Sequence, residues 1–160
     1  MYAVIKVRGS NHTEVGIRRA LLEMRLDRIN HLVLVPETEI GQIKKAKDYI
    51  TWGEVDPEHL TRLIQEKGRM SGEKKVDSMT LKELGFGSFE EMAEKIINGG
   101  VRMKDIPNFK PVFRMNPPRK GYRSTKRTFD FKGALGYRGA EINSLIDSML
   151  EGGELGKRKD

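Results

Sequence analysis

The side chains best placed to do chemistry are cations in the last third of the chain. Residues 101–160 contain 14 Lys and Arg against 7 Asp and Glu, whereas residues 1–56 hold 9 against 8 and residues 57–100 hold 7 against 8. The formal net charge of +7 therefore resides in the last segment, and between Arg102 and Arg138 the imbalance is 11 to 2. A basic stripe on an otherwise balanced chain is typical of a protein that binds a polyanion, although a solubilising surface is the plainer alternative.

Aromatic side chains are interleaved in this stripe, which favours RNA among the polyanions. Lys and Arg contact phosphates, Asn and His reach 2′-hydroxyls and bases, and aromatic rings stack on unpaired bases. The six aromatic residues of the stripe are Phe109, Phe113, Tyr122, Phe129, Phe131 and Tyr137. The spacing predicts that Phe113 is in the core, so Tyr122 and Phe129 are the better stacking candidates.

The residue types give little support for catalysis or for metal binding. His12, His31 and His59 are spread along the chain without helical pairing, and there is no cysteine, so we expect no zinc site. His31 is more typical of a hydrogen-bonded structural histidine or a polar RNA contact than of a base. The glycines at 133, 136 and 139 lack the Lys-Ser/Thr of a phosphate-binding loop and predict a turn before a helix. We expect no enzymatic activity and no cofactor.

The elements that would position these residues begin with a β-α-β-α-β order. Residues 2–7 alternate as a half-buried strand, residues 32–35 form an apolar run that ends at Pro36, and residues 49–52 favour a strand again. Helical spacing predicts a first helix capped by Thr13 and a short second helix from Ile40. Because both crossovers carry helices, these should cover one face of the sheet and leave the other for a partner or for the rest of the chain.

The second half predicts a helical extension of this core. Helices should begin at Asp56-Pro57 and at Ser88, and one added strand should lie near Val112. The Pro-rich segment after Met115 opens an exposed basic loop, residues 116–138. Apolar residues then recur at helical spacing from Ile142 and predict a C-terminal helix that docks on the core.

Together these patterns predict an α+β fold. A truncated ferredoxin-like β-α-β-α-β core would occupy residues 1–56. A mixed helical extension, residues 57–160, would pack on it with one added strand and a C-terminal helix. No apolar run approaches the roughly 18 residues of a membrane span, the N-terminus lacks a secretory signal pattern, and the absence of cysteine fits the cytosol.

Residues 1–56 resemble the universal large-subunit ribosomal protein L-thirty family. The matching segments are Ala3–Arg8, Arg28–Thr38, Ile40–Ile50 and Trp52–Glu54. The second half resembles the archaeal form and its eukaryotic counterpart, L-seven. Phe113–Gly121 is similar to their Pro-Arg-Gly-Gly loop, with Lys120 in place of the first glycine, and Gly133–Met149 is similar to their glycine turn and final helix.

The resemblance implies a non-catalytic, cytoplasmic, ribosome-bound protein that binds large-subunit rRNA near the 5S rRNA, beside neighbouring ribosomal proteins. We expect three groups of RNA contacts. The first is Arg8, Asn11, His12 and Arg18. The second is Arg28, Asn30, His31, Lys44, Lys45 and Lys47. The third is Arg119, Lys120, Arg123, Lys126 and Arg127, with Tyr122 as a stacking ring. The alternatives are a ferredoxin-like regulatory domain that binds a small metabolite, which does not explain the stripe, and an RNA-modifying enzyme, which lacks a convincing base or nucleophile.

Overall fold

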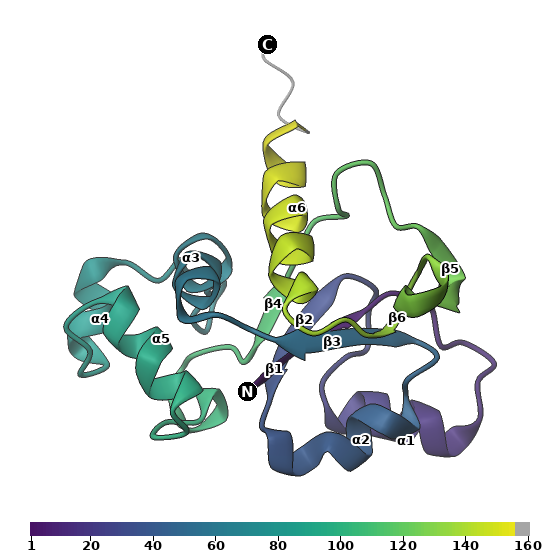
Figure 1. Ribbon diagram of the computed structural model, residues 1–160. Helices are drawn as coiled ribbons and strands as arrows, with labels where there is room; N and C mark the ends of the chain where they lie inside the picture. Colours follow the sequence, from purple (N-terminus) through teal and green to yellow (C-terminus); the bar gives the residue numbers. More distant parts are fainter. Residues whose placement is uncertain (156–160) are drawn as a thin grey trace.

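The computed structural model describes residues 1–155, which form a six-stranded mixed sheet with helices on both faces (Figure 1). The first part of the chain contributes β1 (Tyr2–Lys6), α1 (Val15–Glu23), β2 (His31–Val35), the 3₁₀ turn η1 (Glu37–Glu39), α2 (Ile40–Lys45) and β3 (Ile50–Glu54). β1 pairs antiparallel with both β2 and β3. The predicted α+β class with a ferredoxin-like core is therefore confirmed.

The second half both covers this core and widens its sheet. Its elements are α3 (Pro57–Lys67), α4 (Ser78–Glu83), α5 (Phe89–Ile97), η2 (Met103–Asp105), β4 (Val112–Arg114), β5 (Ser124–Thr128), η3 (Phe129–Phe131), β6 (Gly133–Tyr137) and α6 (Glu141–Leu155). The strand order is β4-β2-β1-β3-β6-β5. β4 is antiparallel to β2, whereas β6 is parallel to β3 and β5 is parallel to β6. Strands from the second half thus flank the core sheet at both edges.

The prediction of one added strand and a continuous loop over residues 116–138 was wrong in part. Residues 116–123 are irregular as expected, but β5 and β6 follow where a loop and a glycine turn were predicted. β5 is rich in Lys and Arg, a composition that an edge strand tolerates because its side chains remain in water. In β6 the buried Ala134 and Leu135 pack against the core, and this tertiary contact overrides the weak strand propensity of glycine.

The starts of three helices depend on local sequence. α3 begins with Pro57 as its first residue, and Ser88 caps α5 by accepting a hydrogen bond from the Glu91 amide at 3.2 Å, both as predicted. α1 begins at Val15 with Glu14 at its N-cap position, one residue after Thr13, the predicted N-cap. The Thr13 hydroxyl therefore does not cap this helix.

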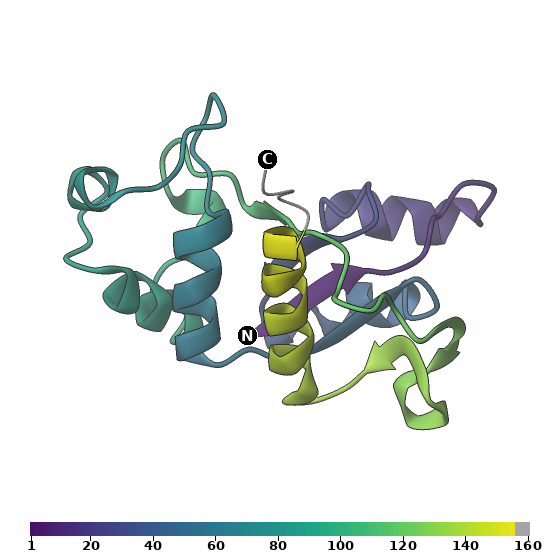
Figure 2. The ribbon, with the colours of Figure 1, turned by 90° about the horizontal axis from the view of Figure 1, so that it is seen from above.

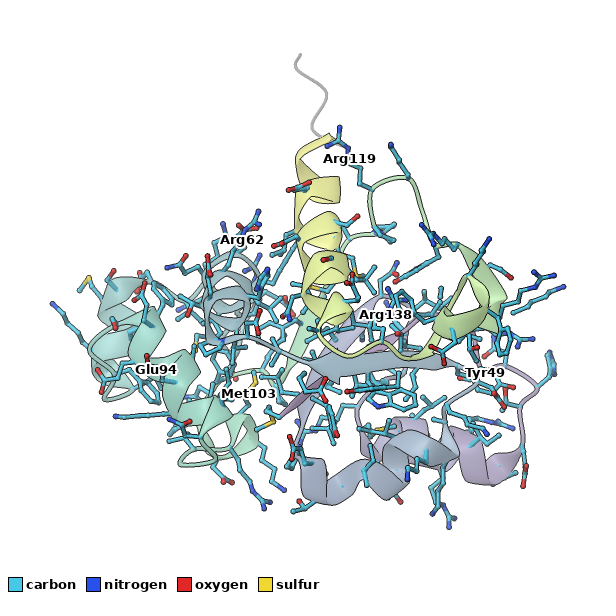
Figure 3. All side chains as sticks on the ribbon, in the orientation of Figure 1. Tyr49, Arg62, Glu94, Met103, Arg119 and Arg138 are labelled. Carbon is cyan, nitrogen blue, oxygen red and sulfur yellow. The ribbon has the colours of Figure 1, made fainter. Side chains whose placement is uncertain are left out.

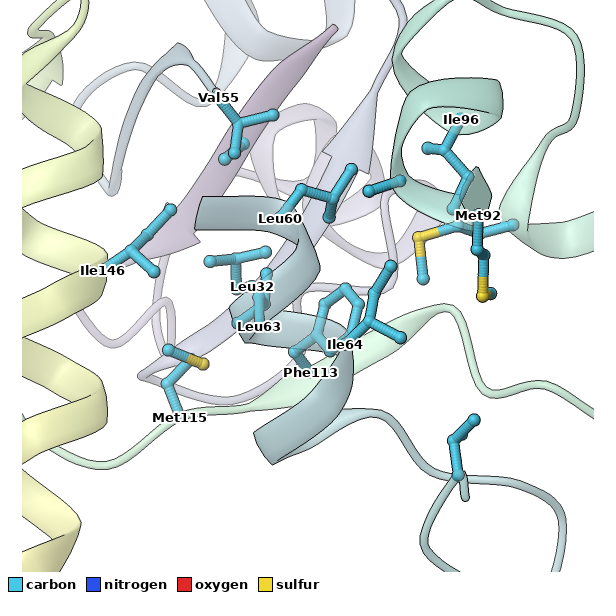
Figure 4. Packing of buried hydrophobic residues seen from close by; sticks show 14 of the residues in the cluster. Leu32, Val55, Leu60, Leu63, Ile64, Met92, Ile96, Phe113, Met115 and Ile146 are labelled. Carbon is cyan, nitrogen blue, oxygen red and sulfur yellow. The ribbon is translucent and has the colours of Figure 1, made fainter. Parts of the chain in front are cut away.

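The two faces of the sheet carry separate cores. On one face α1 and α2 bury Leu21 and Ile43 against Val4 and Trp52. On the other face Ile5 of β1 joins a larger cluster built from α3, α5 and α6. This cluster includes Leu32, Leu60, Leu63, Ile64, Phe113 and Ile146, which lie close together in Figure 4. Phe113 is fully buried, which confirms its predicted place in the core.

α6 fastens the second half onto the core beside α3 (Figure 2). The buried Asn143 accepts a hydrogen bond from the Asp56 amide at 3.0 Å and donates one to the Glu54 carbonyl at 3.2 Å. The helix starts directly over Gly53, where a Cβ would collide with the Gly139 carbonyl. Further along, Asp147 accepts hydrogen bonds from α3. These contacts fix α6 and the segments on either side of it.

Candidate nucleic-acid interface

The connections between strands meet at one end of the sheet, which we call the basic end. β1 finishes there, and β2 and β3 begin there, because both are antiparallel to β1. β4 also finishes there, and β6 begins there beside β3. The predicted residues that come from segments meeting at this end are Arg8, Asn11, His12, Arg28, Asn30, His31, Lys44, Lys45, Lys47 and Arg123. Topology thus gathers residues from all three predicted groups.

Backbone hydrogen bonds hold these segments against one another. The amides of Val7 and Arg8 both donate to the Tyr49 carbonyl, at 2.9 and 3.1 Å. The Asn30 amide donates to the Lys6 carbonyl at 2.8 Å, and its own carbonyl accepts from the Met115 amide at 3.1 Å. Tyr49 marks this end of β3 at the right of Figure 3. The basic end is therefore a bonded surface and not a set of independent loops.

A buried cation, Lys6, anchors the turn that follows β1. Its side chain is only 2% exposed, and Nζ donates to Ser10 Oγ at 2.8 Å and to the Asp27 carbonyl at 2.9 Å. Burial lowers the pKa of Lys6, while the charge of Asp27 opposes this shift. Lys6 therefore links the turn carrying Asn11 to the segment that leads into β2. Arg8, Asn11, His12 and Arg18 all remain exposed around this anchor.

His31 lies at the start of β2, where its environment disfavours the charged form. Nδ1 is 3.3 Å from the nearer carboxylate oxygen of Asp27. Burial lowers the pKa of His31, and it outweighs the opposing effect of Asp27. A neutral imidazole can donate or accept a hydrogen bond but adds no positive charge near neutral pH.

Tyr122, predicted to stack on RNA, instead connects the second and third groups. Its hydroxyl donates to Asn30 Oδ1 at 2.6 Å, across 92 positions of sequence. The ring packs against Val7, Ala134 and Leu135, and burial raises the pKa of the hydroxyl. The side chain is therefore engaged within the protein and positions the irregular segment 116–123 over the basic end.

Phe129, the other predicted stacking ring, is also engaged internally. The guanidinium carbon of Arg138 lies 4.9 Å from its ring centroid, a cation–π arrangement. Arg138 also donates from Nε to Thr51 Oγ1 and from Nη2 to the Ala134 carbonyl, each at 2.8 Å. The buried Thr51 hydroxyl donates in turn to the Gly136 carbonyl at 2.8 Å. This network, absent from the sequence predictions, joins β6 and η3 to β3.

The third predicted group is exposed but is not one cluster. The Arg119 amide bonds to Ser148 of α6, and its side chain lies at the outer end of that helix (Figure 3). Lys120 follows with a φ of 65°, the left-handed conformation that a glycine would adopt readily. Lys126 and Arg127 lie instead on the edge strand β5. The group therefore extends from α6 to the edge of the sheet.

Phe131 was counted among the aromatic residues of the stripe but not among its stacking candidates, yet it is 74% exposed at the end of η3. Two cations of the stripe were overvalued, because Lys110 and Arg114 both form ion pairs with Glu73. The basic residues Lys126, Arg127 and Lys132 around Phe131 in the sequence could have indicated it as a stacking candidate. Nothing in the spacing of two phenylalanines separated by one residue shows which ring points outward.

Three glutamates lie at the opposite end of the sheet. β2 and β3 finish there, followed or closed by Glu37, Glu39 and Glu54. The Tyr137 hydroxyl donates to Glu54 Oε1 at 2.6 Å, and this hydrogen bond is the main cause that raises the pKa of Tyr137 to about 12.

Within residues 1–155, no cluster of three or more histidine or acidic side chains could hold a metal ion. None of the helices described is long and apolar enough to cross a membrane.

Comparisons with known proteins agree in one description. The chain is 49% identical over 152 residues to the large ribosomal subunit protein uL30 of Methanocorpusculum labreanum, covering 93% of this chain and 99% of that protein. It is 46% identical over 153 residues to the uL30 protein of Methanococcus maripaludis, with the same coverage. It is also 46% identical over 150 residues to that of Nanoarchaeum equitans, covering 91% and 96%. No family model matches the chain.

Proposed function

The chain belongs to the uL30 family of large ribosomal subunit proteins, and from this premise we propose that it is a structural component of the large subunit that binds large-subunit rRNA. Family membership confirms the resemblance found in the sequence, and the archaeal relatives confirm its archaeal type. Like the members of this family the protein is not an enzyme, which excludes the RNA-modifying alternative. Nothing observed favours the metabolite-binding alternative.

One observation supports rRNA binding above the others. Segments that are distant in sequence present exposed Arg and Lys side chains at the basic end, namely Arg8, Arg28, Lys44, Lys45, Lys47 and Arg123. Among the described residues, Lys110 and Arg114 form ion pairs with Glu73, and Arg119 lies 4.0 Å from Glu151. Most of the predicted cations form no ion pair there, so they are free to neutralise phosphates. The sixteen residues predicted as RNA contacts stay a proposal, in which Asn30 and Tyr122 position the others.

The resemblance also supports a finer placement. We propose that the protein lies near the 5S rRNA and beside other large-subunit proteins, and that it is cytoplasmic as part of the ribosome. A photo-crosslinking side chain introduced at Lys126, an exposed position of β5, would test this placement in assembled subunits. Crosslinks to 5S rRNA or to the large rRNA close to it are expected, and crosslinks confined to distant rRNA would contradict it.

The experiment on rRNA binding compares two variants that lose the same charge. The first replaces Arg119, Lys120 and Arg123 with alanine, and the control replaces Lys74, Lys75 and Lys82, which are also exposed. Affinity for deproteinised large-subunit rRNA is measured by filter binding over a series of salt concentrations. If each lost cation is one phosphate contact, the slope of log K against log salt should become shallower by roughly 2 to 3 in the first variant.

The control should retain the slope of the unmodified protein. Thermal unfolding of both variants should stay within about 0.5 kcal/mol of that protein, because the substituted side chains are exposed. Equal slopes in the two variants would refute the third group as a contact surface. Failure of the unmodified protein to sediment with large subunits in a cell extract would refute the proposed function as a whole.

A further inference from the structure

Phe131 is the most exposed large hydrophobic side chain among the described residues. Its ring is 74% exposed, compared with 73% for Met79 and 68% for Val15. A phenyl ring in water forfeits the free energy that burial of such a side chain provides. Single exposed apolar residues are common on protein surfaces, so exposure alone carries no function. Phe131 differs from other exposed apolar residues in two ways: its backbone is firmly held, and positively charged side chains surround it.

The backbone that carries Phe131 is firmly held. η3 is closed by a hydrogen bond from the Lys132 amide to the Phe129 carbonyl at 3.1 Å, and Lys132 ends the turn in the left-handed conformation, with a φ of 60°. On one side Phe129 lies beneath Arg138. On the other side Gly133 is packed so closely on Arg127 that a Cβ there would collide with the Arg127 carbonyl. The ring of Phe131 is thus held outward on a supported turn.

The surroundings of this ring are cationic. Phe131 lies over a shallow hollow of about 630 Å³ lined by Lys126, Arg127, Thr128, Asp130, Phe131 and Lys132. Three of these side chains are positive and one is negative, and none of the three forms an ion pair among the described residues. An exposed aromatic face between free cations is complementary to a base and its flanking phosphates.

We propose that Phe131 stacks on an unpaired base of the bound RNA, while Lys126, Arg127 and Lys132 contact the phosphates on either side. This inference rests on the proposed function, since it names the part of the RNA that one segment of the interface takes. The site takes a single-stranded or bulged nucleotide and not a base within a helix, because a stacked and paired base offers no free face. In this proposal Phe131, and not Tyr122 or Phe129, is the residue that stacks, because the side chains of those two are engaged within the protein.

The test separates stacking from charge through the salt dependence of binding. Phe131→Ala should weaken binding to deproteinised large-subunit rRNA by roughly 5- to 150-fold, the range found for loss of one base–aromatic stack. The slope of log K against log salt should not change, because no cation is removed. Phe131→Tyr should restore most of the affinity, since a tyrosine ring also stacks. Lys126→Ala should instead make the slope shallower by roughly 0.7 to 0.9.

Met79→Ala is the matched control, because Met79 has almost the same exposure but lies on α4, away from the stripe. It should bind as the unmodified protein does, and all variants should unfold at the same temperature within error. If Phe131→Ala binds this rRNA as tightly as Met79→Ala, the stacking proposal is overturned and the ring is left to dock on a neighbouring protein. If the unmodified protein itself does not bind the rRNA, the proposed function fails and the stacking proposal fails with it.

Discussion

The hydroxyl of Thr51 gives the sharpest test of how the second half is attached to the core. Thr51 is fully buried in β3, and its Oγ1 donates to the Gly136 carbonyl and accepts from Arg138 Nε, both at 2.8 Å. Thr51→Val keeps the volume of the side chain and removes both hydrogen bonds. Any loss of stability therefore reports on the bonds and not on a cavity.

The expected magnitude follows from the groups left without a partner. A buried acceptor without a partner costs about 1–3 kcal/mol, and a hydrogen bond to a charged group contributes about 1.5–3 kcal/mol. Arg138 is only partly buried and regains some hydration, so we expect a loss of about 2–4 kcal/mol. For a domain of this size each kcal/mol lowers the melting temperature by about 2–4 °C, which predicts a fall of about 4–16 °C.

Thr61→Val is the matched control for this substitution. Thr61 is also buried, but its hydroxyl donates only to the Pro57 carbonyl within α3, at 2.7 Å. That bond is local to a helix, so its loss should cost less than about 1 kcal/mol. Calorimetry or chemical denaturation would compare the two variants. If Thr51→Val is destabilised by no more than Thr61→Val, the bonds of Thr51 do not hold β6 and the reasoning is refuted.

Three further predictions concern single side chains of the interface. Lys120→Gly should leave the melting temperature nearly unchanged, because relief of the left-handed backbone offsets the greater flexibility of glycine in the unfolded chain. The same substitution should make the slope of log K against log salt for rRNA binding shallower by roughly 0.7 to 0.9. An unchanged slope would exclude a phosphate contact by Lys120. Tyr122→Phe should lose about 1 kcal/mol in urea denaturation, because Asn30 Oδ1 loses its donor, and a neutral result would mean that this bond adds nothing. Burial lowers the pKa of His31 in the folded protein, so the unfolded chain binds its proton more readily and stability should fall as the pH drops below about 6.5. His31→Gln should flatten this fall, measured as melting temperature from about pH 7.5 to about pH 5.5, and an equally steep fall in both proteins would contradict the assignment.

The parts of the fold that could be predicted from sequence depend on local patterns. Alternation and helical spacing were enough for the β-α-β-α-β core, and Asp56-Pro57 and Ser88 were enough for two helix starts. Phe113 was placed correctly because it alternates with the charged Arg114 and lies on the same side of the strand as Met115. In each case the residues that decide the structure are neighbours in the chain.

The structure could not be predicted where contacts between residues distant in the sequence determine it. β6 forms because Ala134 and Leu135 find an apolar surface beside β3, which no glycine-rich pattern can reveal. The hydrogen bond from Tyr122 to Asn30, which spans 92 positions, could not be predicted either, and the RNA contact of Tyr122 stays a prediction. Composition predicted that the stripe binds a polyanion, whereas the proposed choice among its aromatic rings required the three-dimensional contacts.

The strand order also has a consequence for the synthesis of the protein. The three central strands are complete at Glu54, but β6, which pairs with the open side of β3, begins only at Gly133, about 80 residues later. At about 5–20 residues per second, translation takes roughly 4–16 s to cover that distance. During this interval the nascent sheet exposes unpaired backbone groups along β2 and β3, which other chains could pair with. Each new copy therefore passes through a period in which its N-terminal half is exposed to aggregation, and shielding of that half at the exit site would govern how many copies fold.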